Sequence, residues 1–241
     1  MTITSPHNQH LKELRRLARR NERERSGRFF AEGEDLVTAA AAAGRDALEG
    51  YRLAGTDLGG DDFQDVEQTA LAAISTLGSG TRVVGVYEQR WSPTAVGPRC
   101  VYLHGVGDPG NVGTVLRSAL AFGASSVALG PGCADPHSPK AVRASMGAIF
   151  DVSIARVDSI DSLPGERIAL VAGMGEPLRA ANDGPLTLLI GAEREGLPVE
   201  VVEECERVCH IPIASESLNA AMAATVALYE VVNRAPIVQA Q

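Results

Sequence analysis

The spacing of hydrophobic and polar positions changes near the middle of this 241-residue chain. In the second half, short apolar runs alternate with stretches whose apolar residues recur at helical spacing. The apolar runs cover 100–104, 126–129, 149–154, 168–172, 186–190 and 208–213. The helical stretches cover 112–122, 139–147, 198–205 and 218–234. This alternation predicts an open α/β fold, a parallel sheet with helices on both faces.

The first half carries a smaller α/β pattern. Its first predicted helix has three apolar residues on one face, with arginines around the rest: Leu11, Leu14 and Leu17. Residues 28–31 predict a short strand, and the alanine-rich helix after it ends before Gly44, a residue type common just beyond helix ends. Two small strands and a helix are expected between 50 and 82, and a further strand at 83–87.

A stretch of loop-forming residues separates the two halves. Residues 91–98 include a serine, two prolines and a glycine, which favour loops over regular elements. We therefore expect two domains, residues 1–95 and residues 96–241, joined by a linker at about 89–98.

The composition is that of a globular protein, with 45% hydrophobic, 22% charged and 4% aromatic residues. No apolar run approaches the roughly 20 residues that a membrane-spanning helix needs. The N-terminal segment MTITSPHNQHLKELRR has no apolar core of the kind that a signal peptide requires. We therefore expect a cytoplasmic protein without a membrane partner.

The cysteines do not form a metal-binding pattern. The chain has four, at irregular spacing: Cys100, Cys133, Cys205 and Cys209. Cys205-x3-Cys209-His210 resembles half of a zinc site, but no second pair completes a tetrahedral shell. The sequence therefore predicts reduced structural thiols and no metal.

Charge is distributed unevenly along the chain. Residues 12–28 contain eight basic and three acidic side chains and carry +5, so the remainder of a chain with net charge −8 carries −13. A local basic patch on an otherwise acidic protein suits an enzyme that binds RNA phosphates at one place. A solvated helix face is the alternative. The candidate RNA contacts are Arg15, Arg16, Arg19, Arg20 and Arg23.

A glycine-rich loop suggests a dinucleotide site, but its context argues against one. Gly105-x-Gly107-x-x-Gly110 follows a predicted strand and precedes a helix. Such a site needs an acidic residue at the end of the second strand, and no acid follows that strand before Asp135. In addition, 109–111 is predicted as the turn before the helix, with Asn111 as its N-cap. A nicotinamide oxidoreductase is therefore disfavoured.

The same loop and helix fit another pattern that extends over nearly the whole chain. Three segments follow one another in order: NVGTVLRSALAFG at 111–123, LIGAEREGLP at 189–198 and IPIASESLNAA at 211–221. They resemble the three motifs of the SpoU (TrmH-like) RNA 2′-O-ribose methyltransferases of the SPOUT superfamily. PKAVRASMGA at 139–148 and GRFFAEG at 27–33 also resemble segments of that family, the second in its N-terminal substrate-binding domain.

The resemblance implies a fold and an activity. The implied fold is a SPOUT domain, an open parallel α/β sheet with a trefoil knot, preceded by a small L30e-like α/β domain that binds RNA. The implied activity is S-adenosylmethionine-dependent methylation of a ribose 2′-hydroxyl in structured RNA by a homodimer. Ribosomal RNA is favoured over transfer RNA, because the N-terminal module resembles those of ribosomal-RNA enzymes.

The resemblance also implies the site. The cofactor would lie against Gly191, Gly196, Ile211 and Leu218, and a glycine suits a place where a ligand presses on the backbone. The third motif is about two residues shorter than is usual in the family, which shortens a loop beside the expected cofactor position.

The implied catalytic residues are Arg117, Asn111, Ser217, Asn219 and Glu193. Arg117 is described in the family as a base, but a guanidinium hardly deprotonates in a protein. A role in orienting the target phosphate and stabilising the developing alkoxide fits its chemistry better. Asn111, Ser217 and Asn219 also suit helix caps, and Arg117 also suits a solvated surface position.

A different class of function stays open beside this one. An RNA-binding protein of the same fold that has lost catalysis would show the same three segments. The short third motif is the feature that suggests this alternative. Transfer RNA stays open as the alternative substrate.

Overall fold

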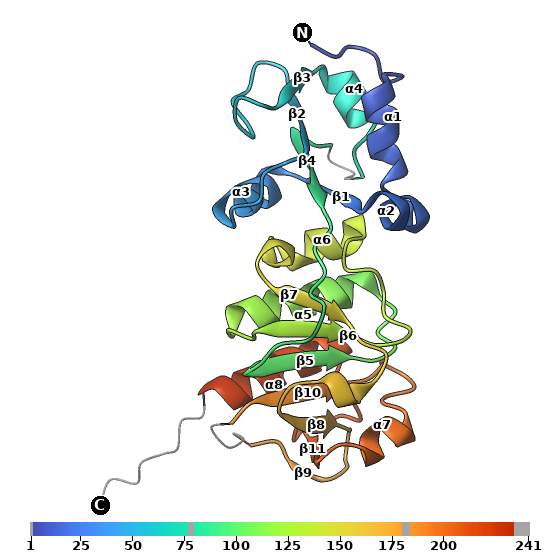
Figure 1. Ribbon diagram of the computed structural model, residues 1–241, viewed down its shortest axis with the longest axis vertical. Coiled ribbons are helices and arrows are strands. Elements are labelled where there is room, and N and C mark those ends of the chain that lie inside the picture. The colour runs from blue at the N-terminus through green and yellow to red at the C-terminus, as the bar shows by residue number, and fades with distance from the viewer. Residues whose placement is uncertain (1, 77–79, 180–183, 234–241) are drawn as a thin grey trace, which may run out of the picture. The chain divides into compact units, whose positions relative to one another are not determined.

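The computed structural model describes residues 2–76, 80–179 and 184–233 (Figure 1). Contacts within the chain divide it into two compact units. Unit 1 comprises Met1–Arg90 and Asp135–Asp151, and unit 2 comprises Trp91–Ala134 and Val152–Gln241. Residues 135–151, which the sequence places in the second domain, therefore pack with the first unit.

Unit 2 is built on a seven-stranded sheet in which every pairing is parallel. The strand order is β7-β6-β5-β10-β8-β11-β9. The strands are β5 (Arg99–Leu103), β6 (Ser126–Leu129), β7 (Ser153–Arg156), β8 (Glu166–Leu170), β9 (Glu176–Pro177), β10 (Leu186–Ile190) and β11 (Arg207–His210). All five residues of β10 are buried, as expected for an apolar run at the centre of a parallel sheet.

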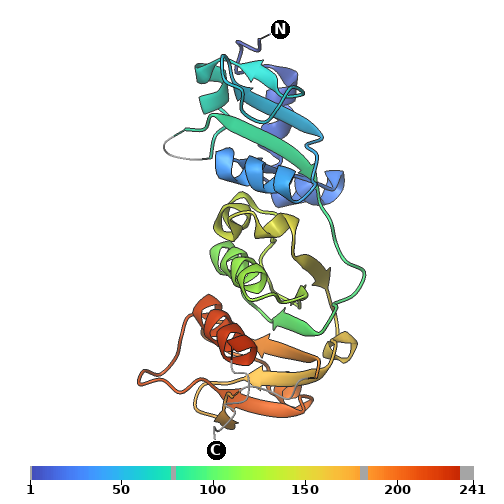
Figure 2. The same ribbon diagram turned by 90° about the vertical axis from the view of Figure 1, so that its left-hand side faces the viewer.

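Helices cover both faces of this sheet, as the alternating pattern predicts. Figure 2 shows α5 (Pro109–Ala121) and α8 (Ala220–Asn233) side by side on one face. On the other face, Val201 of α7 (Val199–Glu203) packs with Tyr102 and Leu189. A short 3₁₀ turn, η2 (Ile160–Ser162), adds Ile160 to the same cluster.

Unit 1 contains a four-stranded mixed sheet in the order β1-β4-β2-β3. Its elements are α1 (Gln9–Arg16), α2 (Arg20–Ser26), β1 (Arg28–Glu32), α3 (Glu34–Ala42), β2 (Glu49–Leu53), β3 (Gln64–Val66), α4 (Gln68–Ala72), β4 (Val83–Glu88), α6 (Pro139–Ser145) and η1 (Ala148–Phe150). The leucines at 11, 14 and 17 are buried in its core, as their spacing predicts. In the described part of the chain, no helix is long and apolar enough to cross a membrane.

Two of the differences from the expected elements concern the start of a strand and the start of a helix. The apolar run 149–154 is not one strand, because Gly147 with φ +95° starts the 3₁₀ turn η1 and β7 begins only at Ser153. The helix expected from residue 112 begins at Pro109, with Asp108 as its N-cap. The Asp108 side chain accepts from the backbone N–H of Asn111 at 3.0 Å, so Asn111 is not the cap.

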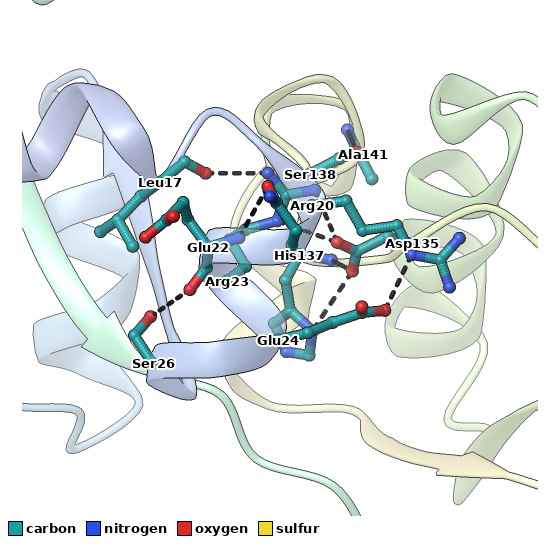
Figure 3. A network of polar contacts seen from close by, with 11 residues as sticks. Leu17, Arg20, Glu22, Arg23, Glu24, Ser26, Asp135, His137, Ser138 and Ala141 are labelled. Carbon is teal, nitrogen blue, oxygen red and sulfur yellow. Dashed lines mark hydrogen bonds and ion pairs between the residues drawn. The ribbon is translucent and has the colours of Figure 1, made fainter.

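A buried ion pair holds residues 135–151 in unit 1 (Figure 3). The Arg23 guanidinium donates to Asp135 Oδ2 from Nε at 2.9 Å and from Nη2 at 2.6 Å, and from Nη1 to the Leu17 carbonyl at 2.8 Å. The two side chains are 3% and 7% exposed. The assignment of Arg23 to RNA phosphates is therefore wrong. The helix breaks after Arg16, and α2 turns Arg23 inward.

The surroundings of Asp135 favour its charged form. Burial by itself would raise its pKa, but the hydrogen bonds from His137 and Arg23 outweigh burial and hold the pKa of this carboxyl well below its usual value. The pair therefore contributes to stability above the unfolded-state pKa of about 4 and loses that contribution as the pH falls below it.

Removing the arginine alone tests this pair. Arg23→Ala leaves a carboxylate buried without its partner, so the free energy of unfolding near pH 7 should fall by about 3–5 kcal/mol. The difference from the wild type should shrink at about pH 3, because the Asp135 carboxyl takes up a proton there in the unfolded chain and in the variant, which lacks the arginine. Urea unfolding at both pH values measures the two effects.

Arg25→Ala is the matched control, because Arg25 is exposed and pairs with Glu22 on the surface of α2 at 2.7 Å. We expect it to unfold almost like the wild type. Equal losses in the two variants would contradict a special role for the buried pair.

Candidate functional site

A cleft of about 400 Å³ lies at the carboxyl ends of β8, β10 and β11. We call it the strand-end cleft. Three segments line it: 170–172 after β8, 190–197 after β10, and residues between 211 and 223 after β11. Ligands of open α/β sheets bind at the carboxyl ends of the strands, and pockets of this size suit small molecules.

A tight turn after β10 forms one wall of the strand-end cleft. Ala192 and Gly196 exchange two backbone hydrogen bonds, at 3.2 and 3.0 Å, and Gly196 has φ +70°. A Cβ at Gly191 would overlap the backbone of Gly196 and Leu197. A glycine is therefore needed at 191 because a side chain there would overlap the backbone of the turn itself, and this reason holds without a ligand.

All four residues expected to hold a cofactor line the strand-end cleft: Gly191, Gly196, Ile211 and Leu218. Glu193 and Ser217, expected to be catalytic, line it too. Sequence reasoning missed Val171 and Ala172, which also line it. They follow β8 without any distinctive residue type, and only the position of β8 next to β10 in the sheet would have pointed to them.

Three of the expected catalytic residues, from three separate segments, are joined by hydrogen bonds. Asn111 Nδ2 donates to Glu193 Oε1, and Asn219 Nδ2 donates to Asn111 Oδ1 at 3.1 Å. Asn219 Oδ1 accepts from the backbone N–H groups of Ala221 and Met222, so Asn219 is the N-cap of α8. The structure thus links the starts of α5 and α8 to the turn after β10.

Arg117 lies apart from this group. It is exposed on α5 and does not line the strand-end cleft. Leu120, three residues further along the helix, is 46% exposed and lies on the same face.

Exposed apolar side chains also lie on α8, the helix that packs beside α5. Ser118 and Thr225 join the two helices through a 2.6 Å hydrogen bond. The side chains of Met222, Val226 and Tyr229 on α8 are 58%, 41% and 56% exposed. We call these three residues and Leu120 the α5/α8 patch.

The basic segment retains part of its predicted surface. Arg16, Arg19 and Arg20 are exposed, and Arg20 pairs with Glu24 at 2.8 Å. Arg15 is half-buried and donates to the Pro6 carbonyl at 3.1 Å.

Nothing in the described segments gathers metal ligands. Among the described residues, no group of three or more His, Cys, Asp or Glu side chains is placed to hold a metal ion. Burial raises the pKa of Cys205 to about 11, so this thiol is protonated at neutral pH, whereas a metal binds the thiolate.

Comparison with known proteins gives matches over both parts of the chain. Residues 98–229 match the SpoU rRNA Methylase family, and residues 8–77 match the MRM3-like substrate binding domain. The chain is 26% identical to the 23S rRNA (guanosine(2553)-2′-O)-methyltransferase RlmP of Bacillus subtilis, over 94% of this chain and 97% of that protein.

Solved structures of two similar proteins match almost the whole chain. The AdoMet-bound rRNA methyltransferase from Sinorhizobium meliloti is 32% identical, with a TM-score of 0.85 over 96% of this chain and 97% of that one. The SpoU methyltransferase AviRb from Streptomyces viridochromogenes, in complex with AdoMet, is 26% identical, with a TM-score of 0.79 over 94% and 97%. The fold of this chain, with its seven-stranded parallel sheet, therefore matches the fold of these enzymes.

The cap on α8 is open to a direct test. Asn219→Ala removes the acceptor for two backbone N–H groups, so the free energy of unfolding should fall by about 0.5–2 kcal/mol. Ser217→Ala is the control, because Ser217 lies just outside the helix and is exposed. Urea unfolding that ranks Ser217→Ala below Asn219→Ala in stability would contradict the capping role.

Proposed function

Because this chain belongs to the SpoU rRNA methylase family, we propose that it transfers a methyl group from S-adenosylmethionine to a ribose 2′-hydroxyl of RNA. The observation that carries this is the hydrogen-bonded group Asn111, Glu193 and Asn219 beside the strand-end cleft. We propose ribosomal RNA, and 23S RNA in particular, in preference to transfer RNA, since RlmP acts on 23S rRNA.

The strand-end cleft suits S-adenosylmethionine. Ile211 and Leu218 offer apolar surface to the adenosine, and the turn from Gly191 to Gly196 offers backbone groups. Glu193, Glu195 and Glu216 also line the cleft, and their carboxylates complement a cofactor with a net positive charge. When bound, the cofactor supplies an electrophilic methyl group. Ile211, Ser217 and Leu218 line the cleft directly, so the third motif reaches the cleft although it is about two residues short.

Arg117 is proposed to serve the nucleophile. A guanidinium stays protonated, so it can orient an RNA phosphate and stabilise the alkoxide that develops as the 2′-hydroxyl loses its proton. Asn111, which itself accepts a hydrogen bond from Asn219, holds the Glu193 carboxylate at the edge of the cleft, and Ser217 adds a hydroxyl there. In-line transfer depends on this alignment of hydroxyl and methyl group.

Assembly and organisation complete the proposal. The α5/α8 patch suits a homodimer interface, because exposed apolar side chains gathered on two helices favour a partner. Arg117 lies on the same face of α5 as Leu120, so a second copy would meet it there.

We propose 96–241 as the knotted methyltransferase domain and 1–95 as the RNA-binding domain. Arg15, Arg16, Arg19 and Arg20 remain its proposed RNA contacts, in a cytoplasmic enzyme.

Methyl transfer with labelled cofactor tests the activity. The purified protein is incubated with S-adenosylmethionine carrying an isotopic methyl group, and with 23S rRNA or transfer RNA, before digestion to nucleosides and mass spectrometry. We expect the label in 2′-O-methylnucleosides from 23S rRNA. Label on a base, or in transfer RNA alone, would refute the assignment. Cofactor binding without any transfer would favour an RNA-binding protein that has lost catalysis.

Arg117→Ala separates catalysis from cofactor binding. Methyl transfer should fall by about 10²–10³-fold, the effect of removing one group that stabilises a developing oxyanion. The Kd for S-adenosylmethionine, measured by calorimetry, should stay within a few-fold, since Arg117 does not line the cleft. Thr114→Ala, exposed one turn away on α5, is the control and should leave both quantities unchanged. Parallel loss of transfer and cofactor binding in Arg117→Ala would contradict this role.

Gly191→Ala tests the wall of the cleft. Its Cβ would overlap the backbone of Gly196 and Leu197, so the turn must shift, and cofactor binding should weaken more than tenfold. Gly184→Ala is the matched control, because a Cβ there meets nothing within 4 Å. Calorimetry measures the Kd for S-adenosylmethionine in both variants. An unchanged Kd in Gly191→Ala would show that this turn is not part of the cofactor site.

A further inference from the structure

A second pocket, of about 200 Å³, is built entirely from residues of unit 1 and shares none with the strand-end cleft. We call it the Arg45 pocket. Its inner wall is aromatic: Phe29, Tyr87, His137 and Phe150 are each 4% exposed or less. Phe150 packs on Tyr87 at 4.9 Å between ring centroids, and Phe29 packs on His137 at the same distance. Leu48, 51% exposed, supplies apolar surface to the lining.

Arg45 is held in place within this pocket. Its Nε donates to the Phe150 carbonyl at 3.0 Å and fixes the plane of the guanidinium. Among the described residues, the two terminal Nη groups make no hydrogen bond, so they are available to a ligand. Arg90, which is exposed, lines the same pocket.

The two guanidiniums are close enough to affect each other. Burial first, and then the charge of Arg90, lower the pKa of Arg45, while Asp151 and Glu88 act in the opposite direction. The Arg45 guanidinium nevertheless stays charged at neutral pH. A ligand with hydrogen-bond acceptors would relieve their repulsion.

The lining also contains two carboxylates, Asp46 and Glu88. These disfavour a bare phosphate, which carries the same charge. The fixed donors of Arg45 beside these acceptors, with the apolar surface of Leu48 in the same lining, match instead the edge of a nucleobase. Proteins that read RNA take up unpaired bases in this way, by stacking and by hydrogen bonds to the base edges.

We propose that the Arg45 pocket binds one unpaired nucleobase of the RNA substrate, with guanine fitting best. Guanine O6 and N7 accept from an arginine, as in the common arginine–guanine contact, and its N1–H and N2–H groups donate to a carboxylate. The inference rests on the proposed action on RNA and adds a specificity site for it. The buried Arg23–Asp135 pair supports the pocket, because it anchors the segment that carries His137 and Phe150.

Mononucleotide titrations of the full-length protein test the base preference. GMP, AMP, CMP, UMP and inorganic phosphate are added in turn, and ¹H–¹⁵N spectra follow the Arg45 Nε–H and the backbone amides around Phe150. We expect GMP to shift these signals at the lowest concentration and phosphate to leave them in place. Equal shifts with phosphate would mean an anion site, and no shift with any nucleotide would overturn the proposal.

Variants connect the pocket to the RNA. Arg90→Gln should weaken binding of 23S rRNA fragments at least tenfold, and Arg45→Gln should do the same. Arg82→Gln is the matched control: it removes the same charge from unit 1, at an exposed residue that pairs with Glu34 at 2.9 Å and lies outside the pocket. Its RNA affinity should stay near that of the wild type. Because Arg45→Gln also loses the bond to Phe150, thermal unfolding is measured alongside, and Arg90→Gln, altered at the surface, should unfold as the wild type does.

The outcomes separate the two proposals. A wild-type protein that neither binds nor methylates RNA would refute the proposed function. A wild-type protein that does both, with Arg90→Gln equal to Arg82→Gln, would refute this inference alone.

Discussion

The backbone of Gly191 packs directly on that of Gly196 and Leu197, and the strand-end cleft depends on that contact. It is possible because β10 lies between β5 and β8 and is hydrogen-bonded to both, which fixes where the strand ends. The turn that follows carries Glu193 to Asn111, and Asn111 in turn bonds to Asn219 at the start of α8. One close backbone approach thus sets the wall of the cleft and the place of its polar side chains.

A second constraint shapes the other unit. The Arg23–Asp135 pair is almost fully buried, so neither partner can be removed without leaving a charge in a dry environment. Through it, a loop and helix that follow β6 in sequence become part of unit 1. The division of the chain into compact units is therefore not a single cut in the sequence, although the two family matches lie on either side of the linker.

The central features of the fold could be predicted because they depend on periodicity. β6 and β10 occupy the predicted residues 126–129 and 186–190, since a short apolar run has few alternatives to a buried parallel strand. The pattern could not show that Ile149 and Phe150 leave the sheet for an aromatic cluster of unit 1, because apolar residues look alike in either core. Arg23 was misjudged for a related reason: its partner, Asp135, lies 112 residues away in the sequence.

For the site, motif resemblance identified residues that the structure brings together, including Asn111, Glu193 and Asn219. The physical reasons were less predictable. A glycine is needed at 191 because of the backbone that follows it in the chain. Asn219 caps α8, whereas α5 is capped by Asp108 and not by Asn111. Arg45 and Arg90 carry no motif, and only the folded chain shows that they share a pocket.

A crystal structure of the protein with S-adenosylmethionine tests the central claim most directly. We expect electron density for the adenosine against the Gly191–Leu197 turn and the 211–218 segment, with the methyl group on the side of Glu193. Cofactor density elsewhere, with the strand-end cleft holding only solvent at saturating ligand, would contradict it.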